Sequence, residues 1–307
     1  MDLPIERNLT VKSQLLIGIL LMLGGDFMFA LNDAMGKWLV SSFSVGQVLA
    51  VRSIGTFVVL GPMIVRQGSS RLLYVERPLL QLLRALASTL DTTCFYVAVV
   101  NLPLADVMSF YMALPIYVAA LSHLLLGEEV GRRRWAAILA GFSGVLIVLK
   151  PSSASLSLSA ICALIGSIAF SFVIVLGRRL RGTSDTTLVT WQMIGTLMVG
   201  LVMTIGNWRT PSPFDFGAML LLGGISCAAH LLITHALKLA PAATLAPLHY
   251  SLLLWAIVFG LTFFGDVPSP RILVGAAIVV LAGLFIFHRQ NILEGTLPPE
   301  NVPKGPS

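Results

Sequence analysis

Six charged side chains lie within the first three long apolar stretches of the sequence. They are Asp26, Asp33, Lys37, Arg52, Arg84 and Asp91. A charge at the centre of a bilayer costs roughly 2.5 kcal/mol or more, so such side chains need a partner, a proton or a bound solute. The chemistry that these residue types indicate is reversible binding inside a membrane. No catalytic residue is predicted.

Two interpretations of this set remain open. In the first, the acids and bases pair with one another between helices, and Lys37 and Arg52 form structural ion pairs. In the second, one carboxylate lacks a permanent base and binds a solute or a proton. Asp26 and Asp91 are the candidates for proton coupling, because they lie deepest in their apolar stretches.

Further polar side chains lie in later apolar stretches. Tyr111 corresponds to His249, and Met112 to Tyr250, when the two halves of the chain are superposed. An aromatic ring beside a hydrogen-bonding group suits an organic solute in a cavity. The candidate substrate-binding residues are Asp26, Asp33, Arg84, Asp91, Tyr111, Gln192, His230, His249 and Tyr250.

Membrane helices must position these side chains. The chain has 307 residues, of which 56% are hydrophobic and 11% are charged, whereas about 25% are charged in soluble proteins. Division at proline, glycine and charge clusters gives ten apolar segments near the length that spans a bilayer. They are 15–37, 46–65, 79–99, 104–126, 134–150, 157–177, 186–206, 214–237, 242–264 and 271–288. The sequence therefore predicts an all-α polytopic membrane protein with ten transmembrane helices.

The charged loops predict the orientation of the chain. Most Lys and Arg residues between the apolar segments, including those at 132–134 and 178–181, fall on the side of both termini. Basic loops stay in the cytoplasm. The prediction is a multi-pass membrane protein with a cytoplasmic N-terminus at 1–14 and a disordered cytoplasmic tail at 289–307. The net charge of +6 thus reports orientation, and no nucleic-acid partner is predicted.

The two halves of the chain are similar to each other. A shift of roughly 140 residues superposes Gly25 and Phe29 on Gly166 and Phe170, and further matches follow in the same order. The predicted repeats are 15–150 and 157–288. Because five helices per repeat is an odd number, the two repeats would enter the membrane from opposite sides. Inverted repeats are typical of transporters that hold their substrate near the midplane.

Several motifs resemble those of a known family. They are NDAMGK at 32–37, VRS at 51–53 and the block 103–151, in which LGE at 126–128 precedes RW at 134–135. On these motifs both halves resemble the EamA domains of the drug/metabolite transporter superfamily. The resemblance implies alternating access around a cavity lined by the first, third, fourth, sixth, eighth and ninth helices. One residue departs from the family pattern: the second half has Asp266 at the position where the first half has Glu128.

The resemblance also implies a function, the secondary transport of a small polar or amphipathic organic metabolite. The superfamily includes exporters and importers of amino acids, S-adenosylmethionine, riboflavin, nucleotide-type solutes and metal-chelating metabolites, so neither substrate nor direction carries over. The alternatives are a non-transporting membrane subunit and an intramembrane enzyme. An enzyme would need a catalytic constellation such as paired His metal ligands, and no catalytic residue is predicted. No cofactor or metal is predicted.

Two sequence features concern how the helices bend and pack. Pro115 and Pro247 fall within the predicted fourth and ninth helices, where they would act as hinges or as static bends. Ala136, Ala140 and Gly144 have the small-residue spacing of close helix contacts, either within the protein or in a homodimer. The predicted partners are a small-molecule solute and the lipid bilayer, with a homodimer left open.

Overall fold

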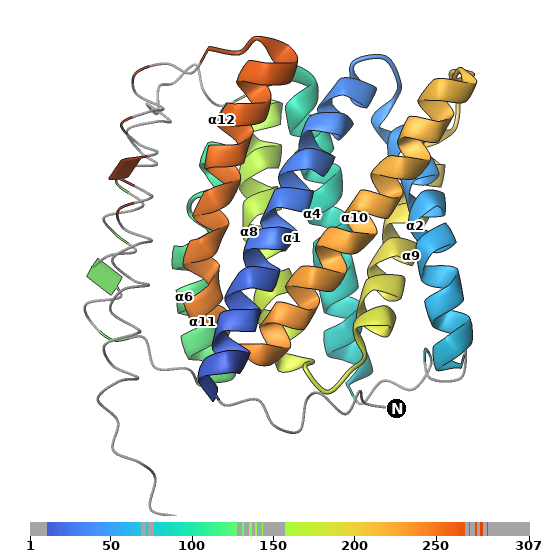
Figure 1. Cartoon of the computed structure of the whole chain (residues 1–307). Helices are drawn as coiled ribbons and strands as arrows, with labels where there is room; N and C mark the ends of the chain where they lie inside the picture. The colour runs from blue at the N-terminus through green and yellow to red at the C-terminus, as the bar shows by residue number, and fades with distance from the viewer. Residues whose placement is uncertain are drawn as a thin grey trace, which may run out of the picture.

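The structure is a computed structural model that describes residues 11–68, 77–127 and 157–267, together with single positions between and after them. Within these residues, six helices are long and apolar enough to cross a membrane. They are α1 (Val11–Val40), α2 (Val45–Gln67), α4 (Pro78–Asn101), α8 (Leu158–Arg179), α9 (Asp185–Thr204) and α10 (Pro213–Leu239). The chain is an all-helical, multi-pass membrane protein, as predicted (Figure 1).

Shorter helices form the segments in which a fourth and a ninth helix are predicted. They are α5 (Leu104–Tyr111), α6 (Leu114–Leu126), α11 (Ala242–Leu245), the 3-10 helix η3 (Ala246–Tyr250) and α12 (Ser251–Phe264). The predicted helices at 134–150 and 271–288 lie outside the described residues apart from single positions, as do the tail at 289–307 and most of 1–14. The first helix begins at Val11, earlier than predicted.

Both predicted proline bends occur as breaks in the helices. Between α5 and α6 the break falls at Met112 and Ala113, just before Pro115. In the second half, Pro247 lies within η3, which joins α11 to α12. Proline has no N–H to donate, so the α-helical hydrogen-bond ladder cannot run through it unchanged. Irregular backbone at membrane depth is tolerated where it lines a cavity or is buried in protein.

Local sequence sets several helix ends. Four helices begin at a serine whose side-chain oxygen accepts a hydrogen bond from the backbone N–H three residues later. They are α2, α8, α9 and α10, with Ser44, Ser157, Ser184 and Ser212. At the other end, Gly127 and Gly265 follow α6 and α12 in the left-handed conformation, with φ of 69° and 66°. Glycine adopts this conformation without the strain of a Cβ.

The two halves interleave in the bundle. The helix α1 packs along α10, α4 along α8, and α2 along α9, so each long contact joins the first half of the chain to the second. In Figure 1, α1 lies between α10 and α12. Glycines allow the closest approach: a Cβ at Gly223 of α10 would collide with the backbone of Arg52 on α2. The centre of the protein is therefore built from both halves.

Apolar side chains cover the outside of the bundle. Leu20, Val58 and Leu158 are 59%, 68% and 72% exposed. A large apolar surface of this kind is unusual for a soluble monomer and suits contact with lipid. Polar side chains instead point inward, as the predicted polar stripe of the first helix requires: Asp26 is fully buried.

Candidate functional site

Helices from both halves enclose a cavity. It is lined by Phe29, Asn32, Asp33, Arg52, Asp91, Thr92, Phe95, Tyr96, Met108, Tyr111, Phe170, His230 and Leu252. The space between these residues is about 460 Å³, including the part open to solvent. The lining comes from the six helices that the resemblance implied, and α2 joins them through Arg52.

Two carboxylates line this cavity, one on α1 and one on α4. Asp91 of α4 accepts a hydrogen bond of 2.7 Å from the Tyr111 hydroxyl, at the end of α5. Asp33 of α1 has no hydrogen bond or ion pair with any other residue that the structure describes. An unpartnered carboxylate inside a membrane protein needs a proton, a water or a ligand. Asp33 is therefore the cavity carboxylate that is available to bind a proton, a water or a ligand.

Arg52 is the cation of the cavity wall, and neutral groups hold its guanidinium. Its Nη1 donates to the Tyr96 hydroxyl at 3.0 Å, and its Nη2 donates to Ser226. Tyr96 in turn donates to Asn32 Oδ1 at 3.3 Å. The Nε of Arg52 has no partner among the described residues, although the side chain is only 2% exposed. Arg52 is thus fixed in place but keeps a donor to spare.

Aromatic rings form much of the remaining wall. Phe29 and Phe170 meet edge to face with their centroids 6.0 Å apart, and Tyr111 lies 6.0 Å from Phe95 and 6.1 Å from Phe170. His230 of α10 contacts the ring of Phe29 at 4.8 Å. The His230 Nε2 is buried without a hydrogen-bond partner in the described part of the chain. The wall thus offers ring faces together with a free imidazole nitrogen.

Asp26 lies outside this cavity lining and has its own partners. Its two oxygens accept a hydrogen bond from Ser251 at 3.0 Å and contact His249 Nδ1 at 2.6 Å. These partners belong to η3 and α12, so the cluster joins the first helix to the broken ninth segment. His249 also packs against the cavity ring Phe170, with a centroid distance of 5.3 Å.

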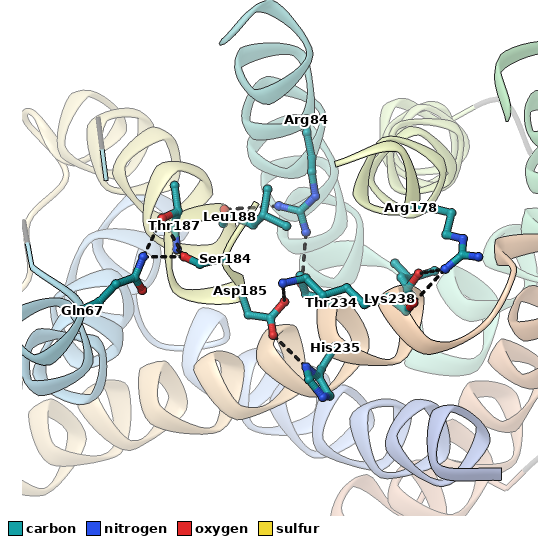
Figure 2. Close-up of polar contacts among 11 residues, drawn as sticks. Gln67, Arg84, Arg178, Ser184, Asp185, Thr187, Leu188, Thr234, His235 and Lys238 are labelled. Atoms are coloured by element: carbon teal, nitrogen blue, oxygen red, sulfur yellow. Dashed lines mark hydrogen bonds and ion pairs between the residues drawn. The ribbon is translucent and has the colours of Figure 1, made fainter. Parts of the chain in front are cut away.

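A polar layer lies at one end of the bundle (Figure 2). Arg84 of α4 donates to Gln192 at 2.9 Å and to Thr234 at 3.2 Å, joining α9 and α10. Asp185, at the start of α9, contacts both His235 and Lys238 of α10 at 2.9 Å. Helices of both halves are therefore linked at this end by charged and polar side chains.

Different contacts join the helices at the opposite end. Lys37 of α1 pairs with Asp266, just after α12, at 3.3 Å, and its ammonium lies 4.7 Å from the centre of the Phe264 ring. Gln47 of α2 exchanges hydrogen bonds with the backbone of Arg209. The bundle is thus tied by polar contacts above and below the cavity.

The structure divides the predicted site residues into groups. Asp33, Asp91, Tyr111 and His230 line the cavity together with Arg52. The remaining candidates are Asp26 with His249, Arg84 with Gln192, and Tyr250, whose buried hydroxyl has no partner within the described ranges. The six predicted charges make no ion pair with one another where the structure describes them. Arg52, Arg84 and Asp91 bond tyrosine, serine, threonine, amide or carbonyl groups instead. Asp26 contacts His249 and Ser251, and Lys37 pairs with Asp266.

Sequence reasoning did not select Asn32, Phe95 or Tyr96, and it used Phe29 and Phe170 only as evidence for the repeat. The structure shows that these two residues also touch, so they lie where the halves meet. The structure also shows that Gly36 packs against Tyr96, because a Cβ at position 36 would collide with the Tyr96 ring.

Comparison with family models gives a match over most of the chain. The model described as the EamA-like transporter family matches residues 16–150 and again residues 157–288. A solved crystal structure of another protein superposes on this chain with a TM-score of 0.71 at 16% sequence identity. It covers 92% of this chain and 99% of the other, a likeness that concerns the fold alone.

Curated relatives of known activity are similar along most of their length. The S-adenosylmethionine uptake transporter of Rickettsia prowazekii is 24% identical over 85% of this chain and 89% of its own. The riboflavin transporter of Vibrio cholerae is 26% identical over 91% and 95%. The pseudopaline exporter of Pseudomonas aeruginosa is 24% identical over 86% and 94%.

Proposed function

Because the chain belongs to the EamA-like transporter family and is a membrane transporter, we propose that it moves a small polar or amphipathic organic metabolite across a bacterial inner membrane by alternating access. The observation that carries this proposal is the cavity whose wall comes from both halves and contains Asp33, which has no partner among the described residues. The relatives are transporters of organic metabolites rather than enzymes, which favours a carrier over the intramembrane enzyme.

The proposed architecture is ten helices in two inverted repeats, 15–150 and 157–288, with both termini in the cytoplasm. Three features support it. The contact of α1 with α10 exchanges with that of α4 with α8 when the halves are superposed. The helix breaks fall in corresponding segments. The basic loops fall on the side of both termini.

The proposed binding residues are Asp33, Arg52, Asp91, Tyr111 and His230. Their hydrogen-bonding groups would fix the polar part of the solute, and the aromatic wall would cover its apolar part. Arg84 and Gln192 would position the helix ends, and Asp26 with His249 would hold the broken ninth segment against α1.

The polar contacts at the two ends of the bundle support a conformational cycle. Arg84 joins α4 to α9 and α10 at one end, and Lys37 pairs with Asp266 at the other, so the cavity lies between two sets of contacts that link the halves. A solute enters when helices of the two halves separate at one end while the other end stays closed. The polar contacts at the two ends would break alternately.

Transport of defined solutes tests the proposal. Purified protein in liposomes is screened for uptake and exchange of amino acids, S-adenosylmethionine, riboflavin and related metabolites, with and without a pH gradient. Saturable movement of one class, absent from protein-free liposomes, is the expected result. If folded, correctly inserted protein moves no member of the panel in either direction, the proposal fails.

A further inference from the structure

The charges around the cavity do not balance. Its lining contains two carboxylates, Asp33 and Asp91, and one permanent cation, Arg52. The guanidinium of Arg52 already donates to Tyr96 and Ser226, and no ion pair within 4.0 Å joins it to either acid. Two basic side chains that lie deep in the neighbouring helices are held elsewhere, Lys37 by Asp266, and Arg84 by Gln192 and Thr234. No Lys or Arg other than Arg52 lines the cavity among the described residues.

No other described group in the wall supplies a fixed positive charge. Every titratable side chain that lines the cavity is accounted for: Asp33 from α1, Arg52 from α2, Asp91 and Tyr96 from α4, Tyr111 from α5 and His230 from α10. The helices α8 and α12 contribute Phe170 and Leu252, which do not titrate. With both acids ionised and His230 neutral, two negative charges face one positive charge.

The aromatic part of the wall favours the same sign of charge. The rings of Phe29, Phe95, Tyr96, Tyr111 and Phe170 all border the cavity. The face of an aromatic ring attracts a cation, and the attraction grows when water is excluded. A cation would balance the surplus carboxylate charge directly, a neutral solute would leave one carboxylate in need of a proton, and an anionic solute would add to the negative charge.

We propose that the cavity recognises a positively charged organic group, such as a sulfonium, quaternary ammonium or amine. Asp33 is its counter-ion, Asp91 is a second carboxylate held by Tyr111, and the rings enclose its apolar substituents. When no such group is bound, a proton on one of the two acids takes its place. The inference rests on the proposed function, since it assigns a substrate class to the same cavity.

Matched probes that differ in charge test it. The first pair is S-adenosylmethionine and S-adenosylhomocysteine, which lacks the sulfonium methyl and its charge. The second pair is choline and its uncharged carbon isostere 3,3-dimethylbutan-1-ol. For at least one pair the purified protein should bind the cation about tenfold more tightly than its neutral partner. Binding of the cation in weakly buffered solution should also release protons, and binding of the neutral partner should not.

Substitutions assign the preference to the cavity acids. In Asp33→Asn the ratio of cation to neutral affinity should fall to near one, while the neutral partner still binds and so reports a folded site. In Asp91→Asn the ratio should fall as well, and proton release should disappear when both acids are replaced. The matched control is Asp215→Asn, which changes a partly exposed carboxylate outside the cavity, at the start of α10, and should keep the wild-type ratio.

The outcomes separate this inference from the proposed function. If neither pair shows a preference for the cation, or if both variants keep the preference of the wild type, the inference is overturned. Saturable transport of neutral solutes alone would overturn the inference and leave the carrier function standing. Absence of any transport would defeat the carrier function itself.

Discussion

At the scale of single residues, Asp91 separates a binding role from a structural one. Asp91→Asn keeps an oxygen that can accept the Tyr111 hydrogen bond and removes the charge. We expect solute transport to fall at least about tenfold, the effect of losing a charged hydrogen-bonding partner worth roughly 1.5 to 3 kcal/mol. Initial rates in liposomes measure it, and thermal unfolding in detergent should stay close to wild type. Unchanged transport would remove Asp91 from the mechanism.

Asp26 should behave differently, because the structure gives it partners. Asp26→Asn weakens its contact with His249 and Ser251 in a fully buried position. Loss of a charge-assisted hydrogen bond of this kind should lower the free energy of unfolding by about 1.5 to 3 kcal/mol. Chemical denaturation in detergent, compared with Asp215→Asn, is the measurement. Wild-type stability with abolished pH-dependent transport would instead make Asp26 a proton site.

The sequence was sufficient to find most of the polar residues in the cavity but not their partners. Asp33, Asp91, Tyr111 and His230 stand out because a polar group in an apolar helix is costly unless it binds or pairs with something. Pairing depends on the height and rotation of each helix, which composition does not contain. Three acids and three bases balance in number, yet Arg52 bonds Tyr96 and Ser226, and Arg84 bonds Gln192 and Thr234.

At the scale of helices, the contact of α2 with α10 determines where Arg52 lies. Gly223→Ala places a Cβ against the backbone of Arg52 and Thr56, which cannot move aside as a side chain would. We expect a loss of unfolding free energy of about 1 to 3 kcal/mol or more, together with weaker solute binding. Thermal unfolding and equilibrium binding measure the two effects.

Gly217→Ala, on the same helix, is the matched control. A Cβ at Gly217 has nothing within 4 Å, and alanine is the better helix former, by up to about 1 kcal/mol. Its stability should equal or exceed that of the wild type. Equal losses in both variants would show that the close approach of α2 and α10 does not matter.

Helix existence was easier to predict than helix continuity. The long apolar segments were found because roughly 20 such residues in a row are typical of a membrane span. The prolines indicated bends, and the structure shows breaks near both. The extent of η3, which begins at Ala246, was not foreseen, because it is stabilised by packing of His249 and Tyr250 rather than by local propensity.

At the scale of the whole molecule, the two ends of the bundle should open separately. Arg84→Ala removes the hydrogen bonds to Gln192 and Thr234 at one end, and Lys37→Ala removes the pair with Asp266 at the other. Each substitution should shift the population toward the state open at its own end. The probe is Thr92→Cys in the cavity wall, in a background without Cys94, Cys162 and Cys227.

A membrane-impermeant thiol reagent applied from each side of oriented membranes reads out this shift. Arg84→Ala should raise the labelling rate several-fold from the side on which Arg84 lies, and Lys37→Ala should raise it from the opposite side. If both substitutions increase labelling from the same side, the two ends are not alternate gates.

The contact of Phe29 with Phe170 has a mechanical consequence. These residues correspond across the two repeats and touch each other, so they lie where the halves meet. In a lever, the fulcrum moves least while the arms sweep the largest arc. A short covalent tether between positions 29 and 170 should therefore leave the rocking of the halves nearly free. The same tether between Lys37 and Asp266, far out on the arm, should stop it.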